Sequence, residues 1–414
     1  MFASTLTFLL FLLLPTYLLR FHIFGLPSTV LEIIILTLVA LVFVQHRQNL
    51  LSTTKELWRT QKILVIGTLL FLAGATISVF TAVSLRAALG EWRAFYVEPI
   101  LVAIAIFLML QQWKRDGVAR EKVFFYILLP LLISGVLTSL LSIYQHFTGW
   151  LVPYSFWENR NTYRVTAWYG FPNGVGLFLA PLFPLALFAL KAGWKEKQPA
   201  KRWLLLSTAT LFILVSPLAI IYAKTTAALV GLAGGLGYLL ISFRKTRAPV
   251  VVLGILLIAT IFGTPQLKSV QDELLARDRS GQLRRDMWHE TQLLLQDHPF
   301  AGAGLASYEE RILPYRQDRS IEVFHHPHNL FLTIWVNTGL VGFLGFFLLT
   351  IWVIKQAWTL STEKNKRLFP LFVASALGVI FVTGLVDSPY IKNDWAVVFW
   401  GLITLLCFST EKKS

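Results

Sequence analysis

The chain has 414 residues, of which 56% are hydrophobic and only 14% are charged. Soluble domains carry about 25% charged residues, so this composition excludes an ordinary soluble protein. Uncharged runs such as 63–80 and 124–141 are long enough to cross about 30 Å of hydrocarbon as helices. We therefore predict an all-α, polytopic membrane protein that forms a single integral membrane domain over residues 1–414.

Twelve segments are apolar enough to be predicted as membrane spans. The first has neither a basic N-terminal region nor a small-residue cleavage site, so we interpret it as a span rather than a signal peptide. The single cysteine, Cys407, lies in the last segment and excludes an internal disulfide. In chain order the predicted spans cover residues of about 3–19, 29–45, 63–84, 95–112, 123–145, 171–190, 203–222, 225–243, 249–264, 339–358, 368–386 and 393–409.

The formal net charge of +15 is distributed unevenly over the loops. One alternating set of loops and termini holds 22 of the 37 lysines and arginines against six acidic residues. Basic residues collect on the cytoplasmic side of membrane proteins, so we predict that both termini are cytoplasmic. This one-sided pattern argues against nucleic acid as a partner and favours a multi-pass membrane protein surrounded by lipid.

The same topology leaves one long polar segment, residues 265–327, outside the cytoplasm. Its pattern predicts a helix over 266–277, a break at Ser280-Gly281 and a second helix over 282–297, which ends at His298-Pro299 because proline disfavours helix in the residue before it. The apolar stretch after His328 is too long for one straight span, so we predict a break at Asn337-Thr338-Gly339. The short cytoplasmic loops contain no nucleotide motif, and any chemistry should therefore be extracytoplasmic.

Four basic residues at the predicted outer boundary are candidates for binding an anion. Lys224 lies between two apolar runs, where an ammonium group is unfavourable unless it is paired or hydrated. It either extends to the interface or binds an anion in a cavity. Arg284 lies on the second loop helix beside Arg285, and Arg164 and Arg93 stand at the ends of other spans. Arginine offers a planar set of donors that suits phosphate oxygens, although each residue alone is also consistent with an ion pair or an interfacial anchor.

Three histidines, His325, His326 and His328, stand at the mouth of a predicted span. Imidazole changes its charge near neutral pH, so His328 is a candidate acid, base or substrate ligand, with His326 beside it. A zinc site is an alternative, but Pro327 restricts the backbone and no cysteine is near. A purely structural role is a third.

In their order along the chain, these residues resemble the O-antigen ligase and O-antigen polymerase superfamily of bacterial membrane glycosyltransferases. The clearest similarity is His328-Asn329, a nine-residue spacer and Gly339-Leu340-Val341-Gly342. Further similarity lies in Arg164 before Pro172-Asn173, Ala223-Lys224-Thr225, and Arg284 followed by Trp288, Asp297-His298-Pro299, Gly302-Ala303-Gly304 and Tyr308. The family pattern carries arginine where this chain has Lys224.

The resemblance implies transfer of a glycan from an undecaprenyl-diphosphate-linked donor to an acceptor hydroxyl on a lipid, a glycan or a protein. His328 would then be catalytic, and Lys224, Arg284, Arg164 and Arg93 would bind the diphosphate. His326, Asn329 and Tyr308 would position substrates, and neither a metal nor another cofactor would be needed. Two alternatives remain open: a repeat-unit polymerase of the same superfamily, and a secondary transporter, although the sequence has no matching pair of broken helices.

Overall fold

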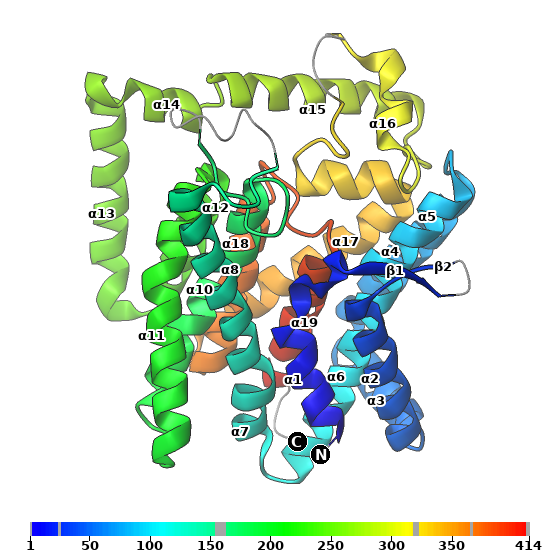
Figure 1. Ribbon diagram of the computed structural model, residues 1–414, viewed down its shortest axis with the longest axis vertical. Helices are drawn as coiled ribbons and strands as arrows, with labels where there is room; N and C mark the ends of the chain where they lie inside the picture. The colour runs from blue at the N-terminus through cyan, green and yellow to red at the C-terminus, as the bar shows by residue number, and fades with distance from the viewer. Residues whose placement is uncertain (1, 24–25, 154–162, 318–322, 365–366, 411–414) are drawn as a thin grey trace.

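The computed structural model describes residues 2–23, 26–153, 163–317, 323–364 and 367–410. Parts of two predicted outer loops, 154–162 and 318–322, lie outside the described residues, as do three of the basic residues counted on the cytoplasmic side, Lys366, Lys412 and Lys413. The described chain is a bundle of helices with α14, α15 and α16 at one end, opposite the end where both termini lie (Figure 1). The termini therefore share one end, as the predicted topology requires, while their cytoplasmic location stays a prediction.

The N-terminal half contributes the helices on one side of the bundle. Helix α1 ends at Leu12 rather than near residue 19, because Pro15 follows in a short 3₁₀ segment, Leu14–Leu18, that opens into an unpredicted antiparallel hairpin. The elements are α1 (Phe2–Leu12), β1 (Arg20–Ile23), β2 (Leu26–Thr29), α2 (Val30–His46), α3 (Leu50–Thr60), α4 (Lys62–Phe80), α5 (Leu85–Glu91), α6 (Glu98–Arg115), α7 (Ala119–Val123) and α8 (Leu129–Thr148), with π-helical turns at Trp92–Val97 and Phe124–Leu128.

The C-terminal half contributes the remaining helices and the polar end. Its elements are α10 (Asn173–Gly193), α11 (Pro199–Tyr222), α12 (Thr226–Ile241), α13 (Arg244–Gly263), α14 (Lys268–Leu274), α15 (Arg279–Asp297), α16 (Tyr308–Arg311), α17 (Leu330–Thr362), α18 (Leu368–Thr383) and α19 (Asn393–Thr410), with 3₁₀ turns at Pro265–Leu267 and Leu313–Tyr315. Helix α13 stands at the edge of the bundle without one buried residue, so its apolar surface is available to lipid (Figure 1).

By length and hydropathy, eight helices of the described chain are able to cross a membrane, and α2 with α3, bent by 96°, would add a ninth. The protein is thus a multi-pass membrane protein, but the predicted count of about twelve spans is not confirmed. The three remaining predicted spans correspond to α1, α12 and α18, which have 11, 16 and 16 residues. Such helices are shorter than the roughly 20 residues that a full crossing needs.

The centre of the bundle is the packing of α17 against α4. A Cβ atom on Gly74 would lie 2.1 Å from the backbone nitrogen of Gly342, and one on Gly345 would lie 2.2 Å from that of Phe71. Backbones in membranes approach closely where such small residues face each other. Aromatic rings then fill the core beside this contact, with Phe71 and Phe346 5.7 Å apart.

Helix α17 is broken at Gly339, which confirms the predicted break. Gly339 has φ 65° and ψ −176°, a conformation open almost only to glycine. The first part of α17 therefore lies beneath α15 at a large angle to the rest (Figure 1).

The loop helices depart from prediction at their boundary. The break falls at 275–278 rather than at Ser280-Gly281, because Asp278 caps α15 by accepting from the backbone N–H groups of Ser280 and Gly281 at 3.2 and 3.1 Å. The predicted end of the second helix at His298-Pro299 is confirmed.

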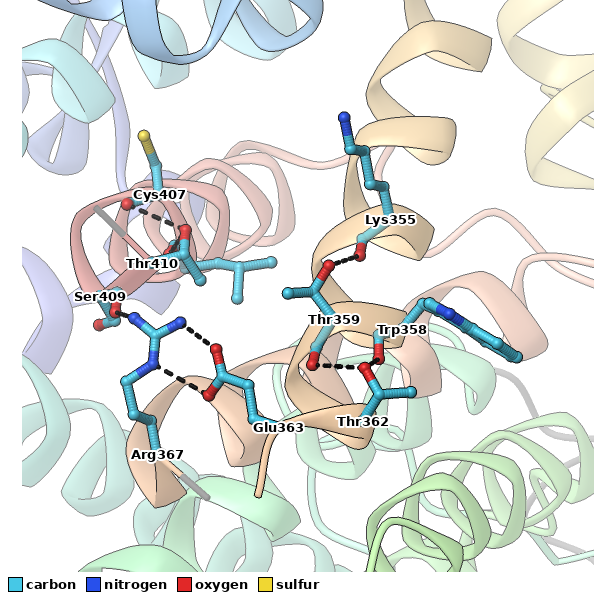
Figure 2. A network of polar contacts seen from close by, with 10 residues as sticks. Lys355, Trp358, Thr359, Thr362, Glu363, Arg367, Cys407, Ser409 and Thr410 are labelled. Atoms are coloured by element: carbon cyan, nitrogen blue, oxygen red, sulfur yellow. Dashed lines mark hydrogen bonds and ion pairs between the residues drawn. The ribbon is translucent and has the colours of Figure 1, made fainter. Parts of the chain in front are cut away.

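At the opposite end, Arg367 joins three helix ends. Its guanidinium donates to both carboxylate oxygens of Glu363, at 2.6 and 3.2 Å, and to the carbonyl of Ser409 at 2.9 Å (Figure 2). This one side chain thereby ties the end of α17 and the start of α18 to the end of α19.

Candidate active site

His328 is paired with an aspartate that the sequence analysis did not select. Its Nδ1 lies 3.1 Å from Oδ1 of Asp387, in the loop between α18 and α19. Asp387 is 2% exposed, and its other oxygen accepts from the side-chain amide of Asn173 at 2.7 Å. A carboxylate only accepts hydrogen bonds, so the proton of the neutral His328 ring stands on Nδ1, and Nε2 remains available to accept a proton from a substrate.

The charge on Asp387 is maintained by its neighbours. Burial alone would raise the pKa of Asp387, but the imidazole of His328, which donates to it, and that of His326 hold this pKa well below its usual range. The backbone N–H of Ser388 also donates to Oδ1, at 2.8 Å. Asp387 is thus an anion that fixes the orientation of His328, as the acid does in a catalytic triad.

The backbone around His328 is held in a strained conformation. Its φ is 48°, which usually raises the energy of a non-glycine residue by about 1–3 kcal/mol. The next residue, Asn329, caps α17 by accepting from the N–H of Leu332 at 3.0 Å and donates to the carbonyl of Leu385 at 2.9 Å. Asn329 therefore fixes His328 beside the loop of Asp387, and its predicted contact with substrate stays a prediction.

Arg164 extends this network toward Lys224. It donates to the side-chain oxygen of Asn173 at 2.8 Å and to the carbonyls of Ala223 and Lys224 at 2.9 and 3.2 Å. Lys224 has φ 50°, a left-handed turn between α11 and α12, and its side chain is exposed. One continuous chain of contacts therefore joins His328, Asp387, Asn173, Arg164 and the backbone of Lys224.

Arg284 acts electrostatically on the guanidinium of Arg164. Burial lowers the pKa of Arg164, and repulsion from Arg284 lowers it further. On α15, Arg284 is half-buried whereas Arg285 is exposed. Arg284 also stands one turn before Trp288, whose indole N–H donates to the carbonyl of Pro327 at 2.8 Å, so the two share the face of α15 that holds the histidine loop.

Two of the three acids near the α15 arginines, Asp278 and Glu290, have other partners, whereas the third, Asp286, is exposed. Asp278 caps the helix, and Glu290 accepts from the backbone N–H of Gln317 at 2.9 Å. Within the described residues, neither Arg284 nor Arg285 forms an ion pair with an acid. Arg164 differs, because the charges of Asp387 and Glu273 raise its pKa. A cation that pairs with no acid among the described residues, such as Arg284, attracts an anion.

The other two histidines differ from His328. The ring of His326 lies 4.7 Å from that of His328, and burial, together with the charge of His328, lowers the pKa of His326 to about 3. His325 is exposed and pairs with Glu309. Across the ranges that the structure describes, no three histidine, cysteine or acidic side chains are grouped to hold a metal ion, so the zinc alternative has no ligand set there.

Two predicted site residues have other partners. Arg93 pairs with Glu32 at 2.8 Å and Glu98 at 3.4 Å, and it donates to the carbonyl of Pro27 at 3.0 Å. Tyr308 is 3% exposed and its hydroxyl lies 2.8 Å from that of Thr291, while burial raises its pKa to about 12. No contact in the described chain joins either side chain to His328.

Sequence reasoning also missed Asn173 as a link and Lys392 as a further cation. The ammonium of Lys392 lies 4.9 Å from the ring centre of Phe171, and its charge lowers the pKa of both His325 and His326. The only signal in the sequence was that Asp387 and Lys392 stand in a short polar loop after an apolar run. Such a pattern occurs both at functional sites and at ordinary membrane–water interfaces.

Residues 209–347 match the family model described as O-antigen ligase. The match covers about a third of the chain, and we call this stretch the O-antigen ligase segment after the family it is similar to. The O-antigen ligase segment contains Lys224, Arg284, Tyr308, His326, His328 and Asn329, whereas Arg164, Asn173 and Asp387 lie outside it. No curated protein matches the chain in sequence. The family is one of membrane glycan transfer, and its members are transferases that use lipid-linked glycans.

Proposed function

We propose that this protein transfers a glycan from an undecaprenyl-diphosphate-linked donor to an acceptor hydroxyl on the outer face of the bacterial cytoplasmic membrane, as an O-antigen ligase does. The observation that carries the proposal is the contact of His328 with a buried carboxylate, continued through Asn173 to Arg164. This network joins an imidazole to a guanidinium, partly within the O-antigen ligase segment, which supports a base and a cation acting on one substrate.

The chemistry needs both parts. Nε2 of His328 would take the proton of the acceptor hydroxyl as its oxygen attacks the anomeric carbon. The bond from that carbon to the diphosphate oxygen would break, and the leaving diphosphate would carry the electron pair away. Arg164, Arg284 and Lys224 would neutralise the charge that builds on it. A single displacement of this kind inverts the anomeric configuration.

No step of this scheme uses a metal ion. The donor is already activated by its diphosphate, so no nucleotide is required outside the cytoplasm. Polymerisation would differ only in the acceptor, which would be a second lipid-linked repeat. No contact in the described residues favours that acceptor over a lipid or protein hydroxyl.

The test is transfer from a purified lipid-diphosphate donor by the purified full-length protein. His328→Ala should lower the rate by about 10²- to 10⁴-fold, the usual contribution of a general base. The matched control is His289→Ala, since His289 is an exposed histidine on α15 and should be dispensable. A His328→Ala protein that is folded and nearly fully active would refute the proposal, and strong inhibition of the wild type by a chelator would refute its metal independence.

A further inference from the structure

A separate cavity of about 530 Å³ lies between the ends of four helical segments, far from the candidate active site. It is bounded by α7 and the turn after it, the end of α10, the start of α18 and the end of α19. Helix α10 begins at Asn173, in the site network, and ends at Gly193, a length of 21 residues. At 1.5 Å per residue that helix is about 30 Å long, so the cavity lies roughly one bilayer thickness from His328.

The floor of the cavity is aromatic. Phe124 and Phe188 stack with ring centres 5.6 Å apart, and Phe369 lies 5.1 Å from Phe188. All three line the cavity. Such a surface suits hydrocarbon and offers little to a soluble polar ligand.

The rim of the cavity is basic. Three exposed cationic side chains line it, Arg120, Lys191 and Lys195, and none of its lining residues in the described part of the chain is acidic. Glu121, the acid next to Arg120 in sequence, is paired with Lys201. The rim therefore presents positive charge that an anionic group would complement.

The acids at neighbouring helix ends are also engaged. Glu363 is bound by Arg367, which in turn donates to the carbonyl of Ser409 on the cavity wall (Figure 2). Glu196 accepts from the backbone N–H of Gln198 at 3.0 Å. Glu121 and Glu363 are thus paired with other cations, and among the described residues no ion pair joins an acid to the three cations of the rim.

Tryptophans mark the depth of the cavity in the membrane. Trp194 and Trp203 are 63% and 68% exposed, next to the end of α10 and the start of α11. Exposed tryptophan is enriched at the level of lipid headgroups. A lipid phosphate at this level would meet the basic rim while its acyl chains reached the aromatic floor.

We infer that this cavity binds one anionic phospholipid of the surrounding bilayer. Its phosphate lies among Arg120, Lys191 and Lys195, and the first part of its acyl chains lies against Phe124 and Phe188. Basic pockets between membrane helices recognise anionic headgroups in this way. Because the cavity lies roughly one bilayer thickness from His328, a lipid bound there is distinct from a glycan donor bound for transfer.

The experiment measures lipid binding by the full-length protein in detergent, by native mass spectrometry and by thermal unfolding. The probes are phosphatidylglycerol and phosphatidylcholine with the same acyl chains, in the absence of a glycan donor. Phosphatidylglycerol should bind more tightly and raise Tm. The triple variant Arg120→Gln/Lys191→Gln/Lys195→Gln should lose about fivefold in affinity per charge, or on the order of 100-fold in all.

The matched control is Lys55→Gln/Lys245→Gln/Lys268→Gln, which removes three cations that do not line the cavity and lie on other elements. It should keep wild-type affinity. A second variant, Ala119→Trp, fills the cavity without changing its charge and should also lose the lipid, so the inference does not depend on one variant folding. Any of three results would overturn the inference. The first is equal affinity for the two phospholipids, and the second is an equal loss of affinity in the two triple variants. The third is that soluble glycerol phosphate or polyprenyl phosphate competes better than phosphatidylglycerol.

Discussion

Replacing Asp387 with asparagine tests whether the carboxylate makes His328 a base. Asparagine has the same size and can still accept from Asn173, but it lacks the negative charge. Asp387 is 2% exposed and lies 3.1 Å from Nδ1 of His328, so water does not screen the contact. A hydrogen bond to a charged group contributes about 1.5–3 kcal/mol, which predicts a decrease in kcat of about 10- to 150-fold.

The assay is steady-state transfer from a purified lipid-diphosphate donor at several donor concentrations. Because Asp387 acts through His328, kcat should fall while the KM for donor changes little. The matched control is Asp394→Asn: Asp394 is equally buried, accepts from the hydroxyl of Tyr169 at 3.0 Å and does not contact His328. A folded Asp387→Asn protein with kcat within twofold of wild type, or an equal loss in Asp394→Asn, would refute the reasoning.

Three further predictions follow from the site. Lys224→Gly keeps the backbone carbonyl that binds Arg164, and glycine suits φ 50°, so this variant should retain Tm but weaken donor binding about 10- to 100-fold. Lys224→Arg should be tolerated. An unchanged KM for donor in Lys224→Gly would show that only the carbonyl of residue 224 is functional. Gly339→Ala should lower Tm and activity because its Cβ would lie 2.1 Å from the carbonyl of Phe300, while Gly237→Ala, with open space around it, serves as the unaffected control. The pKa of His326 is 6.5 in the unfolded chain and about 3 in the folded protein, so the unfolded state binds more protons between these pH values. The free energy of unfolding should therefore fall as the pH is lowered from 6.5 toward 4, and it should fall less steeply in His326→Gln.

The apolar runs were sufficient to predict a multi-pass helical protein, because a bilayer accepts little else. They were not sufficient to count the spans. Helix α1 shows why: its apolar run continues to Leu19, but Pro15 ends the regular helix early, and the hairpin that follows has no strong sequence signal. The break at Gly339 was predictable because the 31 residues from His328 to Trp358 would form one helix of about 46 Å, which exceeds the hydrocarbon thickness of a bilayer.

The site was predictable only in part, and Asp387 explains the limit. Asp387 and Asp394 stand seven residues apart near the same loop, both are buried, and nothing local distinguishes them. Only the packing of α17 against α18 brings the first of them to His328, 59 residues away in sequence. Arg164 likewise donates to the backbone carbonyl of Lys224, 60 residues away in sequence. A motif made of side-chain types cannot predict a contact to a backbone carbonyl.

The spacing between His328-Asn329 and Gly339 acquires a physical reason from the two ends of the helix between them. At the first end, Asn329 caps α17 and the N–H of Leu330 donates to the carbonyl of Gly384 at 2.7 Å. At the other, Gly339 turns the backbone so that the N–H of Leu340 donates to the carbonyl of Phe300 at 3.1 Å. Nine residues of helix rise about 13.5 Å, so the length of the spacer sets the distance between His328 and the turn after α15. Each helical residue also rotates the chain by about 100°, so the same length sets the direction in which His328 faces. The second glycine of the signature, Gly342, then fixes this assembly to the bundle through its contact with Gly74. The signature thus combines one reactive side chain with the backbone geometry that holds it beside Asp387.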